Sequence, residues 1–242
     1  MRTATLARVF SITAIALASF GPRAVLAQPP CCVVPDAGGT AAFPPLCPDG
    51  YQEQNLFRLN GLPPGEPVIG TLKLFDFHNV VESPGGPLGG TLQQWGATLL
   101  VHLKGEGAFA YERIMTMPVQ GQSAAQPRAP GAPIQSFDTE LLAVQGQLPI
   151  GDPDFDLLRI TGGNSFGMPS PGHTTLTVAA AGWAVDSFFD ITYRIDYIGH
   201  PGGPFGGTSN SQTESLKEFS MCHAHPTAAR TSSWGALKLH YR

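Results

Sequence analysis

The fold of this chain is decided by the sequence FFDITYRIDYI, residues 188–198. Large apolar side chains stand at every second position and polar side chains stand between them: Phe189, Ile191, Tyr193, Ile195 and Tyr197 alternate with Asp190, Thr192, Arg194 and Asp196. Successive side chains of a β-strand point to opposite faces of its sheet. This period of two therefore predicts a strand with one buried face and one face in water.

Weaker alternation of the same kind recurs along most of the chain. It is found in residues 98–104, 109–117, 142–148, 176–180 and 237–241. Residues 211–221 could form a short helix, but the Gly-rich turn before them favours a returning strand. No segment has a helical period of comparable strength. We therefore predict an all-β, single-domain fold of about eight to ten antiparallel strands, a β-sandwich or jelly roll. Residues 120–133, mostly Gln, Ala, Pro and Gly, are expected to form a surface loop.

An eight-residue motif occurs twice, as PGGPLGGT at residues 84–91 and as PGGPFGGT at residues 201–208. Each copy follows a strand-like run, and both are expected to be hairpin loops, because Pro fixes φ and Gly accepts positive φ. Two interpretations remain open. One turn type is used twice, or a duplication placed two equivalent loops around a binding surface.

The segments FDTELL (residues 137–142) and VDSFFD (residues 185–190), with the second hairpin motif, resemble recurring segments of uncharacterised secreted bacterial β-rich proteins. The similarity spans residues 67–222. It implies export and a β-rich fold, and it carries over no activity.

The first residues have the features of a signal peptide: Arg2 and Arg8, an apolar run at 9–20, and small residues before Ala27. No later stretch is long enough to span a bilayer. We predict a secreted protein, periplasmic or extracellular, divided into a signal peptide (1–27), an irregular cysteine-containing segment (28–66) and a β-sandwich domain (67–242).

The net charge of the chain limits the classes of molecule that it can bind. Cleavage would remove three arginines and no acid, so the net charge would change from −4 to −7. Nucleic acid is disfavoured, because phosphate binding requires a basic surface. An extracellular polymer or protein is the expected partner.

All four cysteines, Cys31, Cys32, Cys47 and Cys222, follow the cleavage site. An even number in an exported protein predicts disulfides. Adjacent cysteines rarely pair, so two connectivities remain open, and both join the N-terminal segment to Cys222.

Two patterns suggest catalysis. Asp138 and Glu140 are expected on one face of a strand, about 7 Å apart, a separation that glycoside hydrolysis can use; a solvated acidic pair is the alternative. GNSFG (163–167) matches the nucleophile-elbow string around Ser165, with His173 close by. The MPSPG that follows cannot begin the required helix, so we interpret this segment as a glycine-rich loop.

Two patterns suggest metals. Asp152, Asp154 and Asp156 are candidate Ca²⁺ ligands, although the rest of a helix-loop-helix calcium site is missing. His223 and His225 can share a strand face and bind Zn²⁺ or Cu²⁺ with a third ligand from elsewhere. An acidic turn and a polar surface are the alternatives, and no cofactor is predicted.

Aromatic residues offer one further candidate, a flat platform for stacking sugar rings made by Trp95, Trp183, Trp234, Tyr193 and Tyr197. The alternative is core packing, which the strand period favours for Tyr193 and Tyr197. Taken together, the patterns favour a non-catalytic extracellular structural or binding module. A glycan-active hydrolase or a metal-dependent enzyme is the alternative.

Overall fold

The computed structural model describes residues 32–62, 67–107 and 109–221, which form one antiparallel sheet of eleven strands and a short 3-10 helix, η1 (Asn164–Phe166). The strands are β1 (Val33–Val34), β2 (Tyr51–Glu53), β3 (Phe57–Leu59), β4 (Val68–Pro84), β5 (Thr91–Gly105), β6 (Glu112–Ala125), β7 (Ile134–Gln147), β8 (Phe155–Gly162), β9 (Pro171–Ala179), β10 (Gly182–Gly199) and β11 (Ser209–Ser220). The predicted all-β class, a single domain of the sandwich or jelly-roll type, is confirmed. In these residues we find no helix with the length and apolarity needed to cross a membrane.

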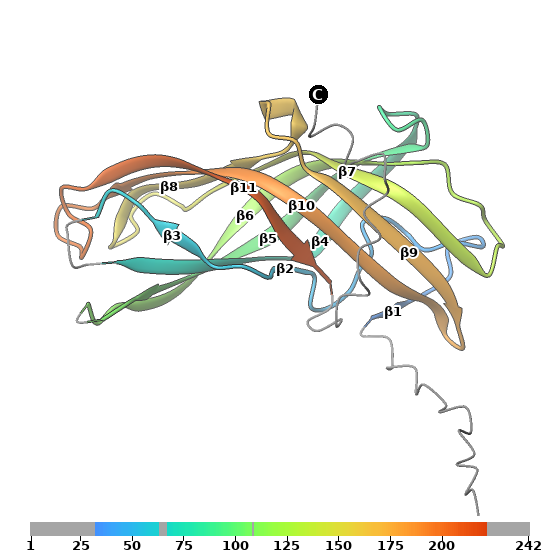
Figure 1. Ribbon diagram of the computed structural model, residues 1–242, viewed down its shortest axis with the longest axis horizontal. Coiled ribbons are helices and arrows are strands. Elements are labelled where there is room, and N and C mark those ends of the chain that lie inside the picture. Colours follow the sequence, from blue (N-terminus) through green and yellow to red (C-terminus); the bar gives the residue numbers. More distant parts are fainter. Residues whose placement is uncertain (1–31, 63–66, 108, 222–242) are drawn as a thin grey trace, which may run out of the picture.

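The sheet closes on itself. The strand order runs β10–β11–β2–β4–β5–β6–β7, and both β8 and β9 pair with β7 on one side and with β10 on the other. In Figure 1 the strands β10 and β11 cross β4, β5 and β6, so the ring is flattened into two layers. Each strand therefore has an inner face in the core and an outer face toward solvent.

The strand predicted at residues 188–198 is confirmed as part of β10. Tyr193, Ile195 and Tyr197 point inward and are nearly inaccessible, whereas Arg194 on the outer face is partly exposed. Burying such side chains stabilises a fold by about 1.5–3 kcal/mol each. The period of two therefore marks the inner face of the strand, whereas Thr192 and Asp196 on the outer face are also buried, at 8% exposed each.

The surface loop predicted at 120–133 is wrong in its first half, because β6 continues to Ala125. Gly121 and Ser123 face the interior opposite Trp95 and Gln93. A Cβ atom on Gly121 would lie 2.1 Å from the ring of Trp95. Small residues are needed here because the indole fills the space, and small residues carry little strand signal.

Both copies of the repeated motif are hairpin loops, as predicted: the first joins β4 to β5 and the second joins β10 to β11. They lie at opposite ends of the molecule and do not frame a common surface (Figure 1). Leu88 of the first loop is half-buried, whereas Phe205, its counterpart in the second, is 1% exposed. One turn sequence therefore serves two different packing roles.

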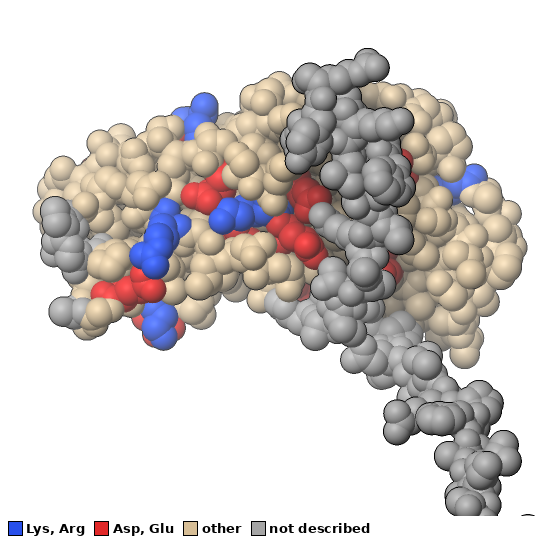
Figure 2. Space-filling model, in the orientation of Figure 1, with Lys and Arg blue, Asp and Glu red and all other residues tan. Residues whose placement is uncertain are grey.

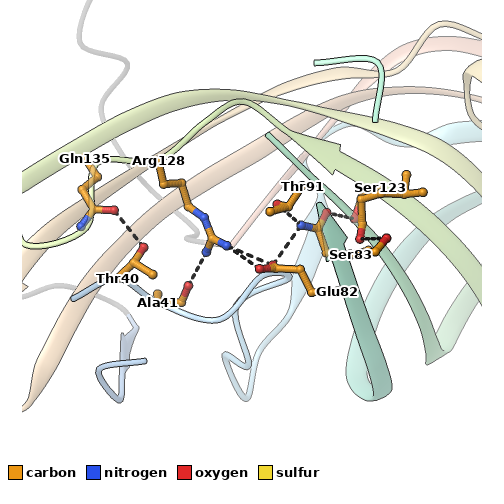
Figure 3. A network of polar contacts seen from close by, with 10 residues as sticks. Thr40, Ala41, Glu82, Ser83, Thr91, Ser123, Arg128 and Gln135 are labelled. Atoms are coloured by element: carbon orange, nitrogen blue, oxygen red, sulfur yellow. Dashed lines mark hydrogen bonds and ion pairs between the residues drawn. The ribbon is translucent and has the colours of Figure 1, made fainter. Parts of the chain in front are cut away.

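The described part of the N-terminal segment contributes β1, β2 and β3 and is otherwise irregular. Arg128 holds it in place by donating one hydrogen bond to the carbonyl oxygen of Ala41 (2.7 Å) and others to the carboxylate of Glu82 (Figure 3). Thr40 donates to Gln135 on β7 at 2.8 Å. These polar contacts add to the burial of several of the segment's apolar side chains in the core.

A disulfide joins Cys32 to Cys47. This bond selects one of the two connectivities that the sequence left open, and it leaves Cys31 and Cys222 as the remaining pair. Both lie outside the described residues.

We predict a Cys31–Cys222 disulfide. The neighbouring described residues support it, because Cys32 accepts a hydrogen bond from Val185 N–H on β10 and Met221 N–H donates to Ser187 O on the same strand. Digestion of the mature protein without reductant, followed by mass spectrometry, should yield a linked Cys31–Cys222 peptide. A Cys31–Cys47 link, or free thiols at these positions, would contradict the prediction.

Candidate functional site

The described core side chains leave little space inside the ring. Two spaces between core side chains, one beside Tyr51 and one beside Tyr193, measure about 10 and 20 Å³. Such volumes hold at most about one water molecule each. Candidate ligand sites among the described residues are therefore on the outer surface.

The three aspartates considered for Ca²⁺ do not converge. Arg113 on β6 clasps Asp152 and Asp154, with nitrogen–oxygen distances of 2.8 and 2.6 Å. Asp156 instead accepts from the imidazole of His200 at 2.7 Å. Burial opposes ionisation of Asp152, but the hydrogen bonds and the charge of Arg113, together with hydrogen bonds from two backbone N–H groups, hold the pKa of Asp152 below its ordinary value. The arrangement is an ion-pair cluster closing the β7–β8 turn.

His223, His225 and Trp234 lie outside the described residues, so the zinc or copper hypothesis stays a prediction. Within the described ranges, we find no cluster of three or more His, Cys, Asp or Glu side chains arranged to hold a metal ion.

The aromatic platform is wrong for its four described members, because each of them belongs to the core. Trp95 and Trp183 are 3% exposed, and Tyr193 and Tyr197 are 1% exposed. Both tyrosines point inward because they occupy the buried positions of β10, as their strand period indicated. Both indole nitrogens donate to protein oxygens, Trp95 to Ser123 and Trp183 to Asp36. These rings cannot stack on a ligand.

Asp138 and Glu140 share the outer face of β7, as predicted. Asp138 lies opposite His173 on β9 and accepts a hydrogen bond from its Nδ1 atom at 2.9 Å. The other imidazole nitrogen, Nε2, is 2.8 Å from the hydroxyl oxygen of Ser136. The structure therefore joins Asp138 to a histidine and a serine, while Glu140 has no part in that contact.

Charged side chains gather in one region of the face shown in Figure 2, and most of the other described surface in that view is uncharged. Ion pairs occur on and between β8, β10 and β11. Asp196 accepts from Arg159 at 2.9 Å and from Arg194 at 3.2 Å, and Lys217 pairs with Glu214 at 3.0 Å. The charges of these five residues are paired locally.

Two grooves of useful size lie on the described surface. One, of about 350 Å³, runs beside Cys47 and is lined mainly by Leu46, Pro48 and Phe75. The other, of about 310 Å³, crosses the outer face of β5, β6 and β7. We call it the glutamine groove, and it is lined by Gln94, Trp95, Gln120, Gly121, Gln122, Ala143, Gln145 and Phe166.

The sheet register sets the geometry of the glutamine groove. Gln94 is paired with Gln122 across β5 and β6, and Gln120 is paired with Gln145 across β6 and β7. Directly paired residues have Cβ atoms about 5 Å apart, so the amides form two adjacent pairs. In the described part of the chain these amides make no hydrogen bond to another protein group. They offer both donors and acceptors to a ligand.

The floor of the groove is rigid and its rim is apolar. Trp95 packs under Gly121 and contacts Phe77 edge-to-face with a ring separation of 5.0 Å, so the floor is held from below. Phe166 of η1 stands beside the groove with 44% of its surface exposed. None of the lining residues is charged.

The sequence patterns predicted neither the glutamine groove nor the contact of Ser136 with His173 and Asp138. The four glutamines lie partly in a strand pattern and partly in the segment predicted to be a loop, and Ser136 belongs to no recognised motif. The outward positions of β5, β6 and β7 are the signal that could have found the groove, once the register of the three strands is known.

No protein-family model, curated protein or solved structure matches this chain.

Proposed function

We propose that this protein is a secreted binding module that holds an uncharged, hydroxyl-rich polymer, such as a polysaccharide, in the glutamine groove. The observation that carries the proposal is the convergence of four amide side chains on one uncharged groove, none of which has a hydrogen-bond partner among the described residues. Export is supported by the features of residues 1–27 and by the Cys32–Cys47 disulfide, since disulfides persist in oxidising compartments.

The chemistry of the groove matches hydroxyl groups. Each glutamine amide presents a carbonyl acceptor and two N–H donors, and a sugar hydroxyl both donates and accepts. An anionic or cationic ligand would lose hydration without gaining an opposite charge here. Phe166 adds an apolar ring face against which a pyranose can pack. A neutral glycan satisfies both features.

Removing two amides from the groove is expected to weaken binding strongly. Gln120→Ala with Gln145→Ala removes one pair of facing side chains, and each lost hydrogen bond contributes about 1 kcal/mol. The dissociation constant for a neutral polysaccharide should therefore rise by about 30-fold. Affinity gel electrophoresis against a panel of neutral and charged polysaccharides, then calorimetry on the best ligand, measures it.

Gln147→Ala is the matched control, because Gln147 lies on the outer face of β7 two residues beyond Gln145 and does not line the groove. Its affinity should equal that of the wild type. Retained binding in the double variant, or binding confined to charged polymers, would remove the proposal.

A further inference from the structure

Three polar side chains on the outer face of β7 and β9 form a chain of hydrogen bonds. Ser136 and Asp138 are two residues apart on β7 and so point the same way, and His173 is the register partner of Asp138. The Ser136 Oγ to His173 Nε2 distance is 2.8 Å, and His173 Nδ1 to Asp138 Oδ1 is 2.9 Å.

The two contacts fix the direction of each hydrogen bond. An ionised carboxylate only accepts, so Nδ1 of a neutral His173 carries the proton and donates it to Asp138. Nε2 is then the acceptor and takes the hydroxyl hydrogen of Ser136. This is the order in which a carboxylate, an imidazole and a hydroxyl activate a nucleophile.

Other histidines of the described chain provide an internal comparison. His102 pairs with Glu112 and His200 pairs with Asp156, and neither has a hydroxyl on its second ring nitrogen. Among the described residues, the ring of His78 has a hydrogen bond only with a backbone carbonyl, that of Asp76. Among the described histidines, the serine partner is therefore particular to His173.

We propose that Ser136 is an activated nucleophile and that this face hydrolyses short-chain carboxylic esters. Ser136 Oγ attacks the ester carbonyl carbon and passes its proton to His173 Nε2, and Asp138 stabilises the resulting imidazolium. The ester C–O bond then breaks, and the departing alkoxide takes that proton and leaves as the alcohol. Water attacks the acyl-serine in the same way, releasing the carboxylic acid and restoring Ser136.

Thr175 supplies the hydrogen-bond donor for the oxyanion. It is the direct register partner of Ser136 on β9, faces the same side, and its hydroxyl has no partner in the described structure. A side-chain hydroxyl aimed at the developing negative charge can serve in an oxyanion site. Of the other groups nearby, Ile134 lies two residues from Ser136 on the same face and is 62% exposed.

The open surface sets the size of the substrate. The grooves described above do not include Ser136. The apolar side chains near this site are the exposed Ile134 and the half-buried Phe188, whose ring centroid lies 6.5 Å from that of His173. An acetyl-sized group fits this surface, whereas a long acyl chain would stay in water. The inference goes beyond the proposed binding function and uses none of the groove residues.

The test uses the full mature chain with a fluorophosphonate probe and with p-nitrophenyl acetate. The probe is expected to label Ser136, identified by peptide mapping, and Ser136→Ala should abolish both labelling and catalysed hydrolysis. Ser165→Ala is the matched control, because that serine lies in the GNSFG segment on η1. The probe should label Ser136 of this variant as completely as it labels Ser136 of the wild type.

Variants of the positioning residues separate chemistry from structure. Asp138→Asn keeps the shape and removes the charge, so kcat should fall at least about 100-fold with KM unchanged, and Asp138→Glu should recover part of the loss. Thr175→Val should lower kcat by about 10- to 100-fold. The inference would be overturned if the probe fails to label the wild-type protein or if labelling survives in Ser136→Ala. A kcat of Asp138→Asn equal to that of the wild type would also overturn it.

Discussion

Phe205→Ala is expected to lower the free energy of unfolding by about 4 kcal/mol, the range for removing a fully buried phenylalanine. Phe205 comes from the second hairpin loop, and its ring lies 4.9 Å from that of Phe155 and 4.8 Å from that of Tyr111. Truncation loses these contacts and leaves a cavity that a closed sheet cannot collapse to fill. Urea denaturation monitored by circular dichroism measures the change.

Leu88→Ala is the control, since Leu88 occupies the same place in the first copy of the repeat. Its side chain is half-buried, so the expected loss is below about 1 kcal/mol. The contrast tests whether one sequence motif serves two packing roles. Equal losses in the two variants would show that the second loop is not a core element.

Stability is expected to fall between about pH 4.5 and pH 7 because of Glu53. Burial raises the pKa of this carboxyl from 4.5 to about 7, against the effect of hydrogen bonds from Tyr193 and from the Leu72 N–H. Below pH 4.5 the group is protonated in the folded and the unfolded chain. Above pH 7 the folded chain must bury a charge, and the shift corresponds to about 3 kcal/mol of lost stability.

Glu53→Gln isolates this effect from other titrating groups. The amide keeps the size of the side chain, can accept from the Leu72 N–H and can donate to Tyr193, and it carries no charge. The difference in free energy of unfolding, variant minus wild type, should increase by about 3 kcal/mol from pH 4.5 to pH 8. If the free energies of unfolding of the two proteins change with pH in parallel, the role assigned to Glu53 is contradicted. Chemical denaturation at closely spaced pH values provides the measurement.

The local sequence pattern was sufficient to predict part of the fold. The alternation in residues 188–198 located both the strand and its buried face, and the Pro-Gly motifs located two hairpins. The local pattern failed at residues 120–125, where Gly121 is small because Trp95 occupies the space opposite it. A residue selected by its partner on another strand leaves no periodic signal of its own.

The candidate sites depended still more on contacts between strands. Asp138 was singled out for a pairing with Glu140, but its partner is His173, 35 residues away on β9. The spacing of Asp152 and Asp154 suggests a cation site, but in the structure both carboxylates bind Arg113. In each case residue chemistry was visible in the sequence, and the partner was not.

The sequence by itself determined that the chain forms strands, which faces of them are buried and where tight turns occur, because period-two burial and turn chemistry act between neighbouring residues. Only the tertiary structure decided that four glutamines share a groove, that Ser136, His173 and Asp138 touch, and that Phe205 is core while Leu88 is not. These depend on strand register and ring closure, which are set by packing between segments far apart in the chain.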